Sequence, residues 1–181
     1  MTIISSVRQL VETPIHAINE GTSPILSYNY GARRPTRVRK SIAVLAVMIL
    51  IYTGVMWGSI IMIPEVLIRI FSSDKTLMKD AVPALKQYFA AFIFMDLQYM
   101  GQTVFKSLNK KKQAIFFSLL RKIIIVVPLT ILLPRLFNLG TNGVFLAEPI
   151  SNFIGGLATY STMILTVWKN LSIEIKKEKI L

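Results

Sequence analysis

The sequence contains no cysteine, one histidine and only nine acidic residues, and each of these scarcities excludes a class of protein. Without cysteine there is neither a disulfide framework nor a thiolate ligand for zinc, and His16 alone cannot form a histidine pair on a metal. We therefore expect no metal site and no cofactor. No glycine-rich phosphate loop followed by lysine is present, which argues against ATP hydrolysis, and no catalytic arrangement indicates an enzyme.

Apolar residues and positive charge are abundant instead. Hydrophobic residues make up 53% of the 181 positions, and 21 lysines and arginines give a formal net charge of +12. With a mean hydropathy of +0.56 the chain has too few polar residues to cover a soluble domain. The basic residues do not gather on one soluble module, so nucleic acid is not the expected partner. This composition predicts an all-α, polytopic membrane protein surrounded by lipid.

Four apolar segments predict transmembrane helices. The clearest covers residues 42–63, which carry no charge and extend for roughly 33 Å as a helix, enough to cross a hydrocarbon core. Three further spans are predicted at 84–105, 114–133 and 143–168, followed by a tail at 169–181.

A fifth helix is predicted at residues 2–28, where polar residues are frequent. Arg8, Glu12, His16 and Glu20 recur at intervals of four and so share one stripe of a helix. Two interpretations fit this stripe: an amphipathic helix on the membrane surface, or a spanning helix whose polar face lines a water-filled cavity. The spacing alone does not distinguish them.

The distribution of basic residues predicts the orientation. Lysines and arginines concentrate in the loop at 31–41, around the connection at 106–112 with Arg121 and Lys122 just beyond it, and in the tail. Loops rich in lysine and arginine remain in the cytoplasm, so these segments and the C-terminus are predicted to be cytoplasmic. The alternation requires the polar first helix to span, and it makes residues 64–79 an external connection.

Acidic residues inside the predicted spans are the candidates for chemistry, because a charge within the membrane usually faces a cavity or a partner. Asp96 lies near the middle of its span, close to Gln98, Tyr99 and Gln102. A buried carboxylate there can exchange protons or attract a cation. The plainer interpretation is a carboxylate that is bonded to a neighbouring helix or is neutral.

Other features of the spans have structural interpretations. Glu148 precedes a proline near the predicted outer end of its helix, where a capping role is expected. Gly101, Gly155 and Gly156 lie in apolar helices, where small residues allow close helix packing.

The stretch at 21–42, GTSPILSYNYGARRPTRVRKSI, resembles the multidrug and toxic compound extrusion (MATE) transporters. The residues that match their signature are Gly21, Pro24, Ile25, Tyr28, Asn29, Tyr30, Gly31, Ala32 and Arg33. The later pattern of the family, a Gly-Gln pair at 101–102 and the segment GTNGVFLAEPIS at 140–151, is similar too. The resemblance therefore extends over essentially the whole chain.

The resemblance implies a fold and an activity. Such transporters have twelve helices in two six-helix lobes, and this chain resembles the eighth to twelfth helices, five of the six in the C-terminal lobe. The family exports cationic and amphipathic compounds in exchange for H⁺ or Na⁺ by alternating access. An acidic residue in the tenth helix of some members contributes to cation binding, and Asp96 lies in the corresponding helix.

The leading hypothesis is a fragment of a cation-coupled multidrug antiporter in the plasma membrane, inactive without a first lobe. Its partners would be membrane lipid, cationic or amphipathic small molecules and, in a split protein, the missing N-terminal lobe. Asp96 is the candidate for coupling. The residues expected to line the cavity with it are Arg8, Glu12, His16, Glu20, Gln98, Tyr99 and Gln102. Two alternatives remain open: a non-transporting membrane partner protein, and a lipid-linked sugar flippase of the wider superfamily, whose cavity is usually more basic.

Overall fold

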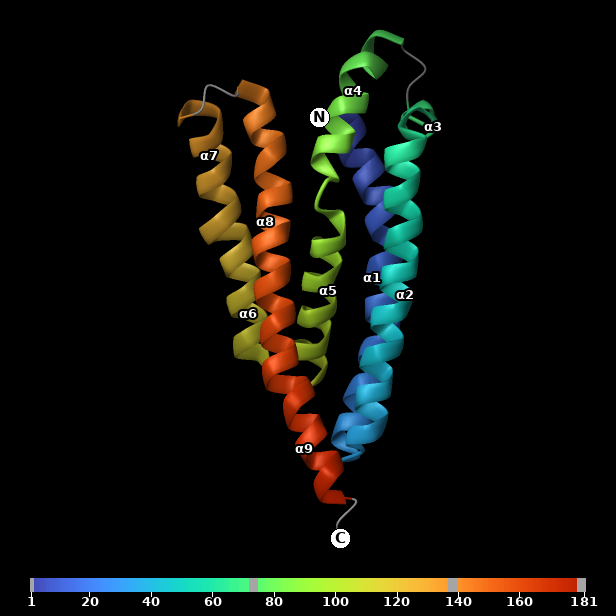
Figure 1. Ribbon diagram of the computed structural model, residues 1–181, viewed down its shortest axis with the longest axis vertical. Coiled ribbons are helices and arrows are strands. Elements are labelled where there is room, and N and C mark those ends of the chain that lie inside the picture. Colours follow the sequence, from blue (N-terminus) through green and yellow to red (C-terminus); the bar gives the residue numbers. More distant parts are fainter. Residues whose placement is uncertain (1, 72–74, 137–139, 179–181) are drawn as a thin grey trace.

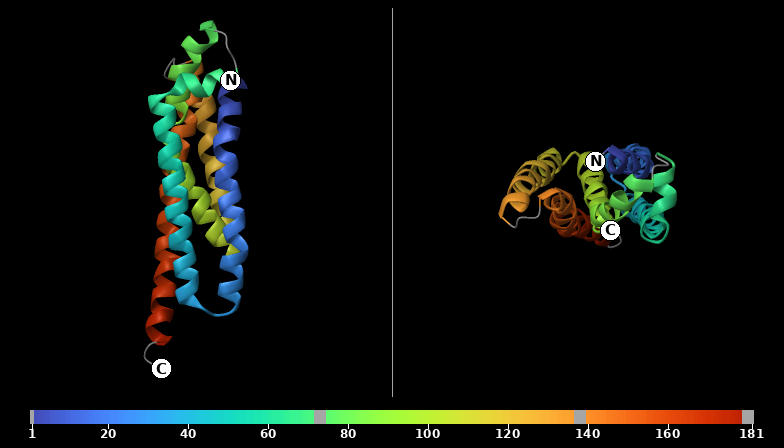
Figure 2. Two further views of the ribbon diagram at one scale, coloured as in Figure 1. Left: turned by 90° about the vertical axis from the view of Figure 1, so that its right-hand side faces the viewer. Right: turned by 90° about the horizontal axis from the view of Figure 1, so that it is seen from above.

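The computed structural model describes residues 2–71, 75–136 and 140–178, and within these ranges all regular secondary structure is helical. The helices run side by side along the long axis of the molecule (Figure 1 and the left view of Figure 2). Across the described residues the chain passes along the bundle five times in alternating directions: α1, α2, α4–α5, α6–α7 and α8–α9. The predicted all-α fold is confirmed.

The first two passes form an antiparallel pair. α1 (Thr2–Gly31) continues through Pro14 and Pro24 as one helix, and α2 (Pro35–Met62) starts with a proline, whose missing N–H is not needed at a first helical position. Buried residues occur along α1 from Ile4 to Leu26. The polar first helix is therefore an integral part of the bundle over its whole length.

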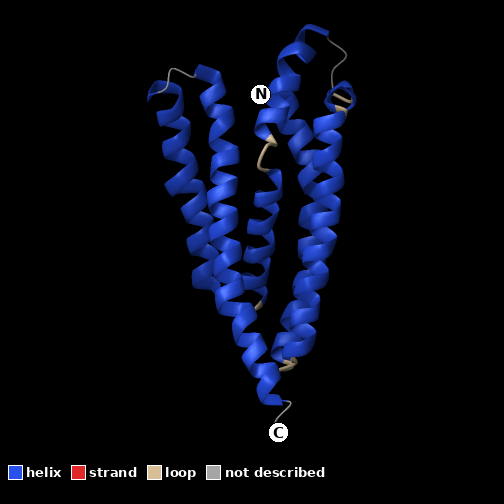
Figure 3. Cartoon of the chain, in the orientation of Figure 1, coloured by secondary structure: helices blue, strands red, loops and turns tan. Residues whose placement is uncertain are grey.

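The third pass is interrupted, so the expectation of one continuous helix at 84–105 is wrong. After α3 (Pro64–Arg69), which lies in the predicted external connection, α4 (Lys75–Tyr88) and α5 (Phe92–Ser107) are separated by the short loop visible in Figure 3. Phe89 and Phe92, on either side of the break, are both buried, and their rings meet edge-on with 5.1 Å between the centroids. No glycine or proline marks this site, and tertiary packing of the two rings accompanies the break. Residues 72–74 of the connection lie outside the described residues.

The fourth pass is one continuous helical rod in three parts. α6 (Lys111–Leu119) leads into a π-helix, η1 (Leu120–Val126), and then into α7 (Val127–Leu136). A π-helix is wider than an α-helix and is frequent at functional sites.

The fifth pass extends beyond the predicted span. α8 (Gly140–Met163) continues through η2 (Ile164–Trp168) into α9 (Lys169–Glu178). The predicted tail at 169–181 is thus helical as far as Glu178, and residues 179–181 lie outside the described residues. Arg39 of α2 lies 4.4 Å over the ring of Trp168, a cation–π contact that holds the two helices together.

Three helical segments are long and apolar enough to cross a membrane: Pro35–Met62, Lys111–Arg135 and Leu146–Glu178. Their outer surfaces carry large apolar side chains that would be unfavourable in water and suit lipid. Examples along α2 and the α6–α7 rod are Val47, Ile51, Val55, Ile115, Phe116, Ile123 and Ile124.

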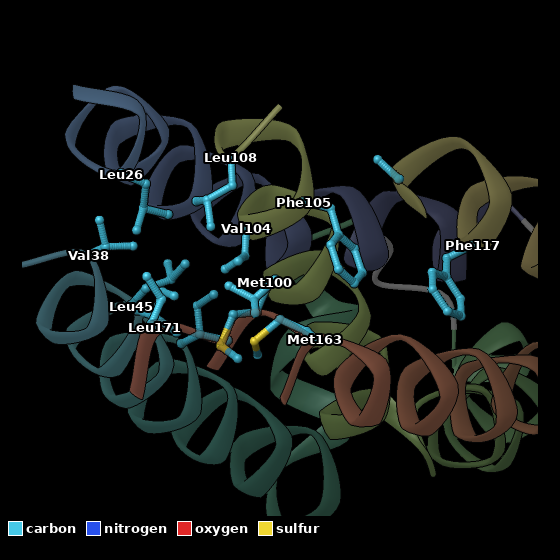
Figure 4. Packing of buried hydrophobic residues seen from close by; sticks show 14 residues of the cluster. Leu26, Val38, Leu45, Met100, Val104, Phe105, Leu108, Phe117, Met163 and Leu171 are labelled. Carbon is cyan, nitrogen blue, oxygen red and sulfur yellow. The ribbon is translucent and has the colours of Figure 1, made fainter. Parts of the chain in front are cut away.

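The interior has two apolar clusters that occupy different heights of the bundle. One contains Leu26, Leu45, Met100, Phe105 and ten further residues, and Figure 4 shows it where α1, α2, α5 and the end of α8 meet. The other is formed by Ile4, Val7, Val11, Ile15, Ile60, Ile68, Leu85, Phe89, Phe92 and Met95. Along α5 the second cluster ends at Met95 and the first begins at Met100. Polar residues of α5 occupy the interval between the two clusters.

α5 packs most extensively against α8, and glycines make this possible. A Cβ added at Gly101 would lie 2.8 Å from Cγ2 of Thr159, and one added at Gly156 would overlap the backbone carbonyl of Phe94. The predicted role of these two glycines in close helix packing is confirmed.

Candidate functional site

The polar stripe of α1 forms one wall of a cavity. Arg8 and Glu12 are joined by an ion pair with 2.6 Å between Nε and Oε1, and Arg8 also donates to the hydroxyl of Tyr88 at 2.8 Å. One turn further, the ring of His16 meets the ring of Tyr99 edge-on, with 4.8 Å between the centroids. The stripe therefore contacts the third pass at two positions, once in α4 and once in α5.

The opposite wall comes from α5. Gln98 is buried, and its amide nitrogen lies 3.5 Å from the carbonyl oxygen of Phe117 in α6. Its Oε1 has no hydrogen-bond partner among the described residues. Tyr99 and Gln102 follow on the face of α5 that is turned toward α1 and the α6–η1 rod. The arrangement brings residues of three passes around one space.

That space is a cavity of about 410 Å³ between α1, α5 and the α6–η1 rod. The seven residues that we expected to line a cavity all lie on it. The further lining residues are Asn19, Thr103, Lys106, Ser118, Arg121 and Lys122. Such a volume falls in the range of small-molecule sites.

Two basic residues of this lining, Arg121 and Lys122, are not revealed by the sequence. Arg121 and Lys122 resemble the flank of a cytoplasmic connection, where positive charges are expected. They lie instead about 15 Å along a helical rod that begins at Lys111. The sequence signal that could have identified them is an Arg-Lys pair inside an otherwise apolar helical segment.

Arg121 is held by a buried ion pair. Its Nη2 donates to Oε1 of Glu148 in α8 at 2.5 Å, and the two side chains are only 7% and 14% exposed. Glu148 lies inside α8, far from the end of that helix, so its predicted capping role is wrong. Because a proline follows it, the position resembles a helix end although the helix continues through Pro149.

Asp96 occupies a separate position. It is fully buried, and one carboxylate oxygen accepts a hydrogen bond from the hydroxyl of Thr53 in α2. Its other oxygen, Oδ1, makes no hydrogen bond among the described residues. Asp96 is not among the residues that line the cavity, whereas Tyr99 on the same face of α5 is. The expectation that Asp96 lines the cavity is therefore wrong, because this turn of α5 is covered by α2.

The residues of the predicted signature form the end of α1 and its turn: Gly21, Pro24, Tyr28, Asn29, Tyr30, Gly31 and Ala32. Asn29 donates from its side chain to the carbonyl of Ile25 at 2.8 Å, and its backbone carbonyl accepts the N–H of Arg34 at 3.0 Å. Arg33 has a φ of 53°, the left-handed conformation that often terminates a helix. This turn and α9 border a second cavity of about 530 Å³. The signature thus shapes the end of the bundle where α1 turns into α2, and none of its residues lines the first cavity.

Among the described residues, no group of three or more histidine, aspartate or glutamate side chains is arranged to hold a metal ion.

Comparisons with known proteins give one family. The MatE family model matches residues 1–132. A FAD transporter from Shewanella oneidensis is 20% identical over 146 residues, which cover 81% of this chain and 32% of that protein. The MATE multidrug transporter DinF-BH, solved as a complex with a bound compound, is 29% identical with a TM-score of 0.80, covering 88% of this chain and 35% of that one.

A second solved structure agrees in fold. It is an inward-facing conformation of a multidrug resistance MATE family transporter of the MOP superfamily, 15% identical with a TM-score of 0.77, covering 96% of this chain and 39% of that one. The chain thus spans 32% to 39% of the length of the proteins it resembles.

Proposed function

Because the chain belongs to the MatE family, we propose that it forms one part of an antiporter that exports small organic molecules across the plasma membrane in exchange for H⁺ or Na⁺. The observation that carries this proposal is the polar cavity of about 410 Å³, bordered by helices whose outer faces are apolar. In this role the chain is a transporter component and performs no enzymatic chemistry. It acts together with a first lobe, which completes the substrate path.

Asp96 is the proposed coupling residue. Its free Oδ1 can accept a proton without rearrangement of the neighbouring helices. Among the described residues, Thr53 is the side chain that hydrogen-bonds to this carboxylate. A proton needs a single lone pair, whereas a metal cation needs several oxygen ligands, so this environment favours H⁺ over Na⁺. Binding at Asp96 would change the charge between the two apolar clusters and bias the packing of α5 against α2.

The substrate class follows from the lining of the cavity. Aromatic and amide side chains suit amphipathic molecules, and the carboxylates Glu12 and Glu20 suit a cationic group. Four basic residues line the same space, however: Arg8, Lys106, Arg121 and Lys122. This basic lining, together with the resemblance to a FAD transporter, supports amphipathic anions as a second candidate class.

The orientation is part of the proposal. The turn at 32–34, the turn at 108–110 and α9 gather at one end of the bundle, and their flanking residues are rich in lysine and arginine (Figure 1). We place this end in the cytoplasm, with the α2–α3 link outside. The non-transporting partner protein and the lipid-linked sugar flippase remain the competing functions.

The decisive experiment co-expresses the chain with a MATE first lobe in cells that lack other exporters and follows ethidium efflux. Export requires both parts if the proposal holds. The variant Asp96→Asn should reduce efflux at least about tenfold, because it removes the ionisable group. The matched control is Asp80→Asn, the same change at an exposed residue of α4, which should leave efflux intact. The proposal is contradicted if the Asp96 variant exports ethidium at the wild-type rate. It is also contradicted if the wild-type chain with a first lobe shows no efflux.

A further inference from the structure

The charges around the cavity do not balance. Arg8 is neutralised by Glu12, and Arg121 is neutralised by Glu148. Among the described residues, no ion pair includes Lys106 or Lys122. Of the two carboxylates on the lining, Glu12 is paired with Arg8, and Glu20 is the one left without an ion pair among the described residues. The wall made by α5 and η1 therefore carries uncompensated positive charge.

Lys122 is the most informative of these residues because of its depth. It lies near the middle of the apolar segment Lys111–Arg135, about 16 Å along the helix from Lys111, where the rod begins. A lysine at this depth is unfavourable unless it faces water or a partner, and such residues commonly mark substrate pathways. The positive-inside rule does not account for it.

Two consecutive basic residues lie on this cavity. Arg121 and Lys122 both line the space, and both belong to η1, a π-helix of the kind that is frequent at functional sites. Ser118, in the preceding turn, lines the cavity too and adds a hydroxyl group.

The Arg121 side chain is fixed and has spare donors. Glu148 accepts from one of its five N–H groups, and the Tyr99 hydroxyl interacts with the same guanidinium. Nε has no hydrogen-bond partner in the part of the chain that the structure describes. A charged group that is held by a neighbour is already oriented for a ligand, and guanidinium and ammonium groups together suit phosphate and carboxylate.

We propose that Lys122 and Arg121 form a subsite of the cavity that binds the oxyanion group, phosphate or carboxylate, of an amphipathic transported molecule. This inference rests on the proposed function, since it names the substrate class of the same cavity. An anionic lipid headgroup offers the same chemistry, but the subsite lies at mid-depth of the bundle, where headgroups do not reside. The transported molecule is therefore the occupant that we infer.

The test uses two ligands that differ by one phosphate. The purified 181-residue chain in phosphatidylcholine nanodiscs is titrated with riboflavin and with riboflavin 5′-phosphate, and binding is followed by flavin fluorescence. We expect the phosphorylated flavin to bind about tenfold tighter. Lys122→Gln should weaken the binding of riboflavin 5′-phosphate far more than that of riboflavin and so remove most of this difference, whereas Lys122→Arg should retain it. Lys112→Gln removes an exposed lysine of the same rod outside the cavity and should have no effect.

The inference would be overturned by equal binding of the two flavins, by an equal loss for both flavins in Lys122→Gln, or by the same loss in Lys112→Gln. A parallel titration in nanodiscs that contain phosphatidylglycerol should preserve the preference. If this lipid abolishes it, the subsite is a headgroup site and the inference fails. Because binding is measured without transport, a failure here is distinguishable from a failure of ethidium efflux.

Discussion

At the residue scale, Asp96 depends on Thr53 for the one side-chain hydrogen bond that we find on its carboxylate among the described residues. Thr53→Val keeps the shape of the side chain and removes the hydroxyl donor. We expect the free energy of unfolding to fall by about 1–3 kcal/mol, because a buried polar group loses its partner. Unfolding in sodium dodecyl sulfate, followed by circular dichroism, measures this change. Thr53→Ser, which keeps the hydroxyl, should lose less stability. Equal stability of the valine variant and the wild type would contradict this role of Thr53.

The pair Arg121–Glu148 allows a sharper test, because breaking a buried ion pair differs from replacing it. Glu148→Leu alone leaves the buried guanidinium of Arg121 without its carboxylate and should lower the free energy of unfolding by about 3–5 kcal/mol. The double variant Arg121→Met with Glu148→Leu should recover most of that loss, since no unpaired charge remains. The same unfolding assay applies to all three proteins. If the double variant is no more stable than Glu148→Leu, the ion pair is not the cause of the loss.

The difference between local and distant information explains which site residues could be predicted. The stripe from Arg8 to Glu20 is encoded by spacing within one helix, so its common face is visible in the sequence. Arg121 and Glu148 come from different helices, and their pairing depends on the rotation of η1 and on the closeness of α8, neither of which has a local signal. The sequence shows that Asp96 is an acidic residue within a span. It does not show that α2 covers this residue.

At the scale of elements, the same distinction holds. The apolar run of α2 predicts its helix well, because length and composition suffice. The break between α4 and α5 has no glycine or proline, and it arises where Phe89 and Phe92 both enter one apolar cluster. The two π-helices likewise lie in sequences that read as ordinary apolar helix. Features that require contacts between passes are the ones that sequence patterns do not predict.

The contact of α5 with α8 leads to a prediction about glycine. Gly156→Ala would place a methyl group against the carbonyl of Phe94, which is backbone and cannot rotate away. We expect the free energy of unfolding to fall by about 1–3 kcal/mol, the usual effect of overpacking. Gly54→Ala is the matched control, since nothing lies within 4 Å of its added Cβ. It should be neutral or slightly stabilising, because alanine is the better helix former. A loss of stability in both variants would show that helix propensity or lipid contact, rather than the α5–α8 packing, is responsible.

At the scale of the whole molecule, apolar outer surfaces and a polar interior cavity invert the pattern of a soluble bundle. Three segments qualify as membrane spans by composition, while α1 and the broken α4–α5 pass do not. These two passes nevertheless run alongside the others and supply most of the cavity lining. Polar side chains that face such a cavity lower the mean hydropathy of a pass, which is why a hydropathy scan undercounts passes of this kind.

The absence of cysteine makes the proposed orientation directly testable. Single cysteines at Ser5, Thr36, Lys79 and Lys176, all exposed, can be reacted with a membrane-impermeant maleimide in intact cells and again after permeabilisation. If five passes alternate and the basic end is cytoplasmic, the cysteines at 5 and 79 react in intact cells, and those at 36 and 176 react only after permeabilisation. The pair at 5 and 36 brackets α1, so it reports whether this polar helix crosses. Reaction of both from the same side would mean that α1 lies along the membrane surface. α1 could then not form the wall of the cavity described above.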